Sequence, residues 1–135
     1  MLFGQEHVRV YRESGGEEGH EWQPGVFTLL LTTTGRTSGD PHTAPLIYGQ
    51  LGEEYVVVAS KGGAPEHPDW YLNLEQDPDV EIQVGPDVMA ATARTVSGED
   101  RRQLWELMAG IWPQYEDYAT KTDRDIPVVA LTPRR

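Results

Sequence analysis

The first sign of chemistry is a turn, Ser60-Lys61-Gly62-Gly63, which directly follows an apolar run from Tyr55 to Val58. Lys61 is the only lysine or arginine between Arg36 and Arg94, a stretch rich in Asp and Glu. Because glycine lets consecutive N–H groups point inward, such a turn can bind an anion, and the ammonium adds charge. The alternative is a solvated hairpin whose lysine keeps a strand edge soluble. This segment by itself favours the solvated hairpin.

A second polar turn, Thr33 to Gly39, combines hydroxyl side chains, glycines and the guanidinium of Arg36. Arginine offers a bidentate fork that suits phosphate or carboxylate. The alternative is an ordinary solvated turn. If the intervening strands pair as a hairpin, the two turns lie near one another. Arg36 and Lys61 would then contact the same anion.

A third cluster is aromatic and gathers toward the C-terminal part of the chain. Aromatic rings can wall a flat ligand, and a tyrosine hydroxyl can hydrogen-bond it or donate a proton. The alternative is core packing of a helix, which is favoured for Trp105, whereas both interpretations stay open for Tyr115 and Tyr118. The cluster consists of Trp70, Tyr71, Trp105, Trp112, Tyr115 and Tyr118.

Several common sites have no support in the sequence. No glycine-rich dinucleotide or P-loop motif follows a predicted strand, and the four histidines lack metal-ligand spacing. The absence of cysteine excludes disulfides and thiolate chemistry. Ser60-Lys61 is not the S-x-x-K motif of acyl-transfer enzymes. We therefore expect no metal centre, and a hydrolase is poorly supported.

The elements that must position these residues form one domain, because 135 residues suit one hydrophobic core. Residues 1–20 are expected to form an arm or a short helix. Hairpin connections predict a mainly antiparallel sheet closed into a small barrel, with helices at its side. The predicted strands are 26–33, 43–50, 55–59, 80–84, 88–96 and 126–131, and the predicted helices are 68–76 and a capped segment from Ser97 to Ile111, followed by a turn from Pro113.

The formal charge of −11 and a pI near 4.6 argue against nucleic-acid binding, which needs a basic patch. Apolar runs are far shorter than the roughly 20 residues that cross a bilayer. No charged-then-apolar leader is recognisable. We expect a cytoplasmic protein with at most transient contact with a membrane.

Several motifs in fixed order resemble the deazaflavin-dependent nitroreductase and quinone reductase family, from about Tyr11 to the end of the chain. They are Thr33-Thr34-Gly35-Arg36-Thr37-Ser38-Gly39, Pro45-Leu46-Ile47-Tyr48, Val58-Ala59-Ser60-Lys61-Gly62-Gly63, His67-Pro68-Asp69-Trp70-Tyr71-Leu72-Asn73-Leu74, Pro113-Gln114-Tyr115-Glu116-Asp117-Tyr118 and Thr122-Asp123-Arg124-Asp125-Ile126-Pro127-Val128-Val129.

The resemblance implies an α+β fold, a split β-barrel like those of flavin reductases and FMN-binding proteins, with flanking helices. It also implies the cofactor F420, a deazaflavin that carries a phosphate and an oligoglutamate tail. Proteins of this family pass a hydride from reduced F420 to quinones, nitroaromatics or other electron-poor acceptors. A small-molecule acceptor is therefore the expected partner.

The same resemblance assigns cofactor contacts to the two polar turns and their neighbours. Arg36 and Lys61 would meet the anionic tail, while Val58 and Ala59 would lie along the ring. The remaining expected cofactor contacts are Thr37, Ser38, His42, Pro45, Ser60, Gly62, Gly63 and Trp70.

The acceptor side is assigned in the same way. Tyr115 and Tyr118 are the expected catalytic residues, with Tyr115 donating a proton or hydrogen bond to the acceptor oxygen. Ile47, Tyr48 and Trp112 are expected to form the acceptor pocket. Trp112 and Ile47 stand where nitro-reducing relatives carry tyrosines, so the choice of acceptor is expected to depend on them.

Two other classes of function remain compatible with the sequence. One is an FMN-dependent reductase or oxidase on the same barrel, since Arg36 and Lys61 do not by themselves distinguish FMN from F420. The other is a carrier or sensor that binds deazaflavin, haem or a lipid without reacting. Tyrosines at positions 115 and 118 favour catalysis over carriage.

Overall fold

In the computed structural model, which describes residues 2–134, the first apolar run forms β2 (Val26–Thr34). This strand pairs antiparallel with β3 (Pro41–Ile47) on one edge and with β6 (Asp79–Val84) on the other. It is rich in β-branched and leucine side chains, which favour a half-buried pleated surface. The rest of the fold is arranged around β2.

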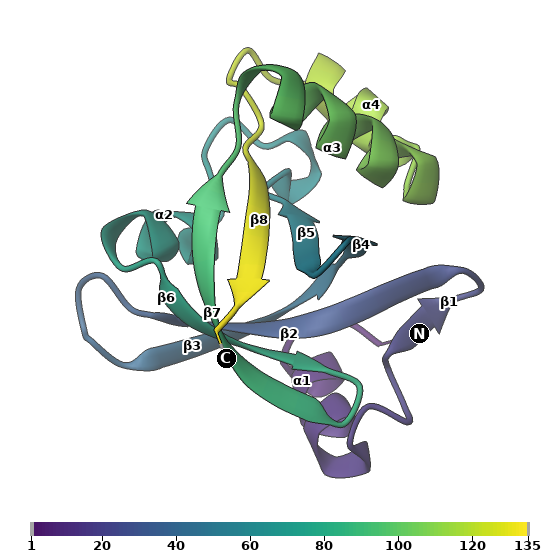
Figure 1. Cartoon of the computed structure of the whole chain (residues 1–135), viewed down its shortest axis with the longest axis vertical. Coiled ribbons are helices and arrows are strands. Elements are labelled where there is room, and N and C mark those ends of the chain that lie inside the picture. Colours follow the sequence, from purple (N-terminus) through teal and green to yellow (C-terminus); the bar gives the residue numbers. More distant parts are fainter. Residues whose placement is uncertain (1, 135) are drawn as a thin grey trace.

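The eight strands form one curled sheet in the order β1-β2-β6-β7-β8-β5-β4, with β3 attached to β2 (Figure 1). Every pairing is antiparallel. The predicted α+β class with a closing antiparallel sheet is therefore confirmed. The other strands are β1 (Glu21–Gln23), β4 (Gly49–Leu51), β5 (Glu54–Val58), β7 (Asp87–Thr95) and β8 (Val128–Pro133), and the helices are α1 (Gly4–Ser14), η1 (Lys61–Gly63), α2 (Asp69–Gln76), α3 (Gly98–Ile111) and α4 (Gln114–Thr120).

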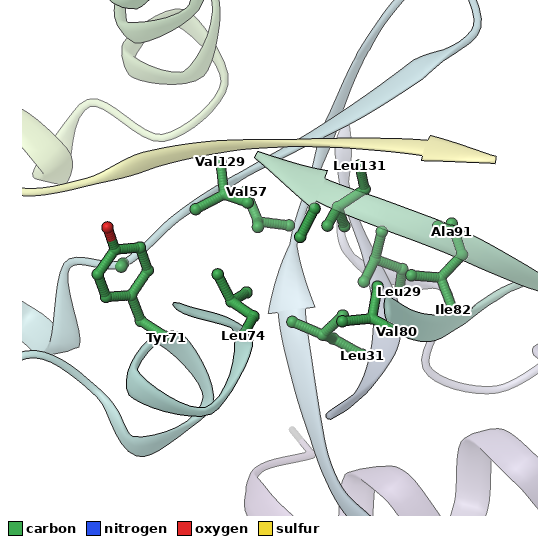
Figure 2. Close-up of a cluster of buried hydrophobic side chains, with 12 residues drawn as sticks. Leu29, Leu31, Val57, Tyr71, Leu74, Val80, Ile82, Ala91, Val129 and Leu131 are labelled. Atoms are coloured by element: carbon green, nitrogen blue, oxygen red, sulfur yellow. The ribbon is translucent and has the colours of Figure 1, made fainter. Parts of the chain in front are cut away.

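The main core fills the inside of the curled sheet. Leu29 and Leu31 point inward from β2 because alternate strand residues face the same side. They meet side chains from β5, β6 and β8, including Val57, Ile82 and Val129 (Figure 2). Helix α2 closes this core with Tyr71 and Leu74. The helix that follows the polar turn after β5 is thereby fixed against the sheet.

Helix α1 settles the prediction for the N-terminal segment in favour of a helix. It packs on the outer face of the curled sheet, against Leu30 of β2 and against β3, at the other end of the view from α3 and α4 (Figure 1). Its anchor is Tyr11, which is fully buried beside Leu30 and donates a hydrogen bond to the Thr28 carbonyl at 3.0 Å. The Tyr11 hydroxyl also accepts a hydrogen bond from the Gly85 N–H at 2.7 Å.

Helices α3 and α4 cover the outer face of β5 and β8 (Figure 1). Leu104 and Met108 of α3 are buried against that face, as the i, i+3, i+4 spacing predicts. The packing is close at Gly49 of β4, where an added Cβ would lie 2.8 Å from the Met108 sulfur. Helix α4 carries Tyr115 back toward the barrel.

The strand predicted over residues 43–50 is wrong as a single element. Its first part is β3, which pairs with β2, and its last part is β4, which pairs with β5. The chain changes partner at Tyr48, because the curled sheet turns a corner there and no single strand can follow both neighbours. The short strand β1 is not signalled by the sequence.

The predicted capping box at the start of α3 is also wrong in its chemistry. Ser97 does occupy the N-cap position, with extended backbone angles, but its side chain makes no capping hydrogen bond. Gly98 follows with a φ of 60°, so the chain enters the helix through a left-handed residue. None of the helices between residues 2 and 134 combines the length and apolar character needed to cross a bilayer.

Candidate functional site

Two cavities lie next to one another and share Trp70 as a wall. The first, about 390 Å³, is called here the aromatic cavity. The second, about 460 Å³, is called the arginine cavity. The aromatic cavity is lined by residues 2–4, 7, 22, 28, 45–47, 58, 60–62, 68, 70, 112, 115 and 118, and the arginine cavity by residues 35–38, 42–44, 69, 70 and 73.

The turn after β5 has the backbone geometry of an anion-binding nest. Ser60 is right-handed helical (φ −79°, ψ −38°), and Lys61 follows with a left-handed φ of 47°. This alternation turns successive N–H groups toward one concavity. The turn is closed by hydrogen bonds from Gly63 N–H to the Ser60 carbonyl and from Ala64 N–H to the Lys61 carbonyl. Neither closing bond uses the N–H of Lys61 or Gly62.

Lys61 is, among residues 2–134, the single non-glycine residue with a positive φ. A left-handed conformation costs an L-residue about 1–2 kcal/mol, and such strain is often found at functional positions. The Lys61 Nζ lies 3.4 Å from Glu66 Oε1, and both side chains are exposed. Exposed ion pairs of this kind contribute little free energy, so the ammonium can exchange Glu66 for an anionic ligand.

The arginine cavity is built around Arg36, which is held from the first turns of α2. Its Nη1 donates to Asn73 Oδ1 at 2.8 Å, and its backbone N–H donates to the same oxygen at 3.1 Å. Asn73 is buried and donates in turn to the Thr33 hydroxyl. The Arg36 Nη2 lies 3.3 Å from the exposed carboxylate of Asp69. Arg36 is thus preorganised, with part of its guanidinium facing the cavity.

The other residues predicted around this turn also line the arginine cavity, namely Thr37, Ser38 and His42. The Ser38 hydroxyl accepts a hydrogen bond from the Asp40 N–H. Neither cavity is lined by both Arg36 and Lys61, so these two cations face adjoining cavities on either side of Trp70.

Tyr115 and Tyr118 both line the aromatic cavity. Burial raises the pKa of Tyr115 above its ordinary value, and the neighbouring Tyr118 adds to the shift. Tyr115 is buried, and its ring centroid lies 6.1 Å from that of Tyr118, so both rings form part of the same wall of the cavity. The Tyr118 hydroxyl accepts a long hydrogen bond from Trp112 Nε1 at 3.4 Å.

The aromatic cavity is also lined by eight further residues for which the sequence predicts contact with the cofactor or the acceptor: Pro45, Ile47, Val58, Ser60, Lys61, Gly62, Trp70 and Trp112. Tyr48 does not. Consecutive strand residues alternate sides, so Tyr48 points away from Ile47 and packs beside Tyr55. Its hydroxyl and His20 Nε2 are 2.8 Å apart, and burial raises the pKa of Tyr48 to about 12.

Ala59 and Gly63 likewise lie outside the cavity lining. The Ala59 side chain is fully buried in the main core, and its N–H donates to the Pro127 carbonyl. Gly63 packs against α4, where an added Cβ would lie 2.8 Å from the Tyr118 carbonyl oxygen. Both residues support the shape of the turn, and neither presents a side chain to a ligand.

Two residues that line the aromatic cavity, Phe3 and Trp22, are not predicted from the sequence. Phe3 and Trp22 meet edge to face at 5.7 Å, and Trp22 also lies 5.7 Å from Trp112. Trp22 Nε1 donates to the Leu2 carbonyl at 2.8 Å. Because Trp22 and Trp112 are far apart in the chain, only the folded structure brings them together.

Comparisons with known proteins agree with this architecture. A family model described as F420H(2)-dependent quinone reductase matches residues 3–133. An F420H(2)-dependent quinone reductase of Mycobacterium tuberculosis H37Rv is 42% identical over 131 residues, 95% of this chain and 88% of that protein. A solved F420-H2 dependent reductase is 44% identical, covers 77% of this chain and 92% of its own, and superposes with a TM-score of 0.72.

The haem storage protein HutZ of Vibrio cholerae has the same fold with a TM-score of 0.63. It is only 19% identical, and the match covers 100% of this chain and 92% of that one. These neighbours confirm the predicted split β-barrel. The matched family model and the 42% identity of the mycobacterial enzyme together confirm the predicted resemblance. The chain belongs to the F420H(2)-dependent quinone reductase family.

Proposed function

We propose that this protein transfers a hydride from reduced F420 to a quinone, with both reactants in the aromatic cavity. The observation that carries the proposal is that the strained Lys61 turn and Tyr115 line the same cavity. One end of the cavity thus suits an anion, and another offers a proton donor. A reductase with an acidic cofactor and a carbonyl acceptor needs both.

The chemistry of the wall fits the cofactor. Pro45 and Val58 give apolar surface for a flat ring, and the Lys61 nest with its ammonium suits phosphate or glutamate. Arg36, across Trp70 in the arginine cavity, supplies a second cation for the acidic tail. The chain has a net charge of −11, so most of its surface repels an acidic cofactor. These two cations therefore restrict the binding of such a cofactor to the cavities that they line.

When bound, reduced F420 supplies a hydride to the acceptor. The protein's own contribution is to hold the two reactants in contact and to exclude water. Ile47, Trp22 and Trp112 make an apolar and aromatic wall on the acceptor side. Confinement of this kind lowers the entropic part of the barrier and strengthens electrostatic interactions within the cavity.

Reduction of a quinone to a hydroquinone adds one hydride and one proton in total. The negative charge that the hydride brings develops on a quinone oxygen, which then takes up the proton. Tyr115 is the proposed donor to that oxygen. The hydroxyl is protonated at neutral pH, and burial raises its pKa further, so it can donate a hydrogen bond to the developing charge without ionising in the resting protein. A proton passed from Tyr115 would be replaced from water at the cavity mouth.

The proposal is tested by titrating the purified protein with F420 and with FMN, following fluorescence quenching. Reduced F420 is then mixed with menadione and its oxidation recorded by absorbance. We expect F420 to bind more tightly than FMN and its reduced form to be oxidised by the quinone. Tight FMN binding without F420 binding would point to a flavoenzyme, and F420 binding without oxidation would point to a carrier.

Lys61→Ala tests the anion end directly. Loss of a charged hydrogen bond is expected to cost about 1.5–3 kcal/mol, roughly a 10- to 150-fold rise in the F420 dissociation constant. Arg9→Ala is the control, because Arg9 is an exposed cation of α1 that pairs with Glu13 and lines neither cavity. Equal affinities for the two variants would remove Lys61 from the site.

A further inference from the structure

Arg124 lies in the segment between α4 and β8, yet its guanidinium reaches the turn that follows β5. Its Nε donates to the Ala64 carbonyl at 2.8 Å, its Nη1 to the Ala59 carbonyl at 3.2 Å and its Nη2 to the Ser60 carbonyl at 2.7 Å. These carbonyls flank Lys61 on both sides. One side chain therefore clamps both ends of the candidate anion-binding turn.

His67 completes the contacts of this guanidinium. The Arg124 Nη1 lies 2.9 Å from His67 Nδ1, and a guanidinium can only donate, so Nδ1 accepts. The imidazole is then neutral with its proton on Nε2. The His67 ring packs on Tyr71 of α2, with ring centroids 5.0 Å apart. Through His67 the clamp is tied to the helix that also carries Trp70.

The geometry of the peptide group links these contacts to the cavity. In a trans peptide the C=O of one residue points opposite to the N–H of the next. Drawing the Ala59 and Ser60 carbonyls toward Arg124 therefore directs the N–H groups of Ser60 and Lys61 the other way. Ser60 and Lys61 line the aromatic cavity, whereas Arg124 does not. The strained φ of 47° at Lys61 is held by the same contacts.

We propose that Arg124 is a positioning residue for cofactor binding: it orients the peptide groups of the Ser60–Gly63 turn toward the anionic part of F420 without touching the ligand. The inference rests on the proposed function, because it assigns Arg124 to the turn at which the cofactor tail is held. Only arginine suits this position, because its planar guanidinium donates to several carbonyls at once, whereas a lysine ammonium reaches fewer of them.

The test compares Arg124→Lys with Arg101→Lys in the full-length protein. Arg101 is a matched control, since its Nη2 donates to the Ile126 carbonyl at 2.7 Å in the same C-terminal segment and it does not contact the turn. For Arg124→Lys we expect the F420 dissociation constant to rise by about tenfold or more. We also expect faster amide hydrogen exchange at residues 60–64 in the cofactor-free protein. Arg101→Lys should change neither quantity.

A second variant, His67→Phe, keeps the ring on Tyr71 and removes the acceptor for Nη1, so it should raise the dissociation constant by a smaller factor. A double-mutant cycle with Lys61→Ala then shows whether Arg124 acts through the turn. The combined loss of affinity should be less than the product of the two single losses.

The outcomes separate this inference from the proposed function. If F420 binds the wild type tightly but Arg124→Lys and Arg101→Lys bind it equally well, the inference is overturned and the function stands. Independent, fully multiplicative losses for Arg124→Lys and Lys61→Ala would also overturn it. If the wild type does not bind F420 at all, the proposed function fails and the inference fails with it.

Discussion

At the scale of single residues, Lys61 combines two properties that usually belong to different amino acids. Its ammonium offers charge to a ligand, and its left-handed backbone would suit glycine better. Glycine at this position would relieve strain but remove the charge. A lysine held in this conformation is thus best explained by binding, because stability alone does not favour it.

Comparison of Lys61→Gly with Lys61→Ala separates these two properties. Both variants lose the ammonium, so both should lose F420 affinity to a similar extent. Glycine tolerates a positive φ, so Lys61→Gly should be more stable than Lys61→Ala by about 1 kcal/mol. Urea unfolding measures the stability difference and fluorescence quenching measures the affinity. A Lys61→Gly variant with wild-type affinity would show that the charge is not used.

Tyr115→Phe tests the proposed proton donor. The change removes only the hydroxyl of a residue that lines the aromatic cavity, so F420 affinity should stay near that of the wild type. The kcat for quinone reduction should fall by at least about tenfold, because a positioned acid commonly contributes more than that. Stopped-flow oxidation of reduced F420 measures the rate.

Tyr71→Phe is the matched control for Tyr115→Phe. It removes a hydroxyl that lies 2.9 Å from Thr95 Oγ1, away from both cavities. Its kcat should be that of the wild type, with any loss confined to stability. Full turnover by Tyr115→Phe with every quinone tried would contradict the assigned role.

The candidate residues that the sequence alone singles out are those whose chemistry is unusual for their position. Lys61 stands alone in an acidic stretch, Arg36 sits in a hydroxyl-rich turn, and Tyr115 follows a proline break. Asn73 and Arg124 were not assigned roles, because an asparagine inside a helix and an arginine in a loop are ordinary. Their importance lies in contacts that only the fold creates. Asn73 accepts a hydrogen bond from a residue that is 37 positions earlier in the chain, and Arg124 contacts residues that are 57 to 65 positions earlier.

At the scale of elements, the sequence predicts strands and helices where one periodicity persists and fails where the chain changes partners. The continuous apolar run of β2 and the helical stripe of Leu104 and Met108 on α3 are recovered because each keeps one pattern along its whole length. The break between β3 and β4 is missed, since Tyr48 continues a β-like pattern through the corner. The N-terminal segment is ambiguous because its helix depends on Tyr11 being buried under the sheet.

The N-terminal elements also contribute a wall of the aromatic cavity, and Trp22→Ala tests this. An aromatic contact such as that between Trp22 and Trp112 is worth about 0.5–1.5 kcal/mol, so the quinone KM should rise roughly two- to tenfold. The F420 dissociation constant should change little. Phe27→Ala is the control, because Phe27 is a half-exposed aromatic residue nearby that lines neither cavity. An unchanged KM would place the acceptor elsewhere.

At the scale of the whole molecule, several buried tyrosines couple stability to alkaline pH. Burial raises the pKa of Tyr11, Tyr48, Tyr71 and Tyr115 above the ordinary value of 10.0, in Tyr48 to about 12. As the pH rises past 10, the unfolded chain loses these protons before the folded chain does. The folded state then binds more protons, so its stability must fall as pH increases.

Urea unfolding between about pH 9 and pH 11 should therefore give a falling free energy of unfolding. Tyr48→Phe should make the pH dependence shallower, because one group with a raised pKa is removed. Constant stability across this range would contradict the raised pKa values of these hydroxyls.

The central claim is that the Lys61 turn holds the acidic part of F420, and it is tested most directly by removing the acid from the ligand. The wild type and Lys61→Ala are each titrated with F420 and with the deazaflavin chromophore that lacks phosphate and glutamates. We expect the wild type to prefer F420 and Lys61→Ala to lose most of that preference while binding the bare chromophore normally. Equal binding of both ligands by the wild type, or an unchanged preference in Lys61→Ala, would contradict the claim.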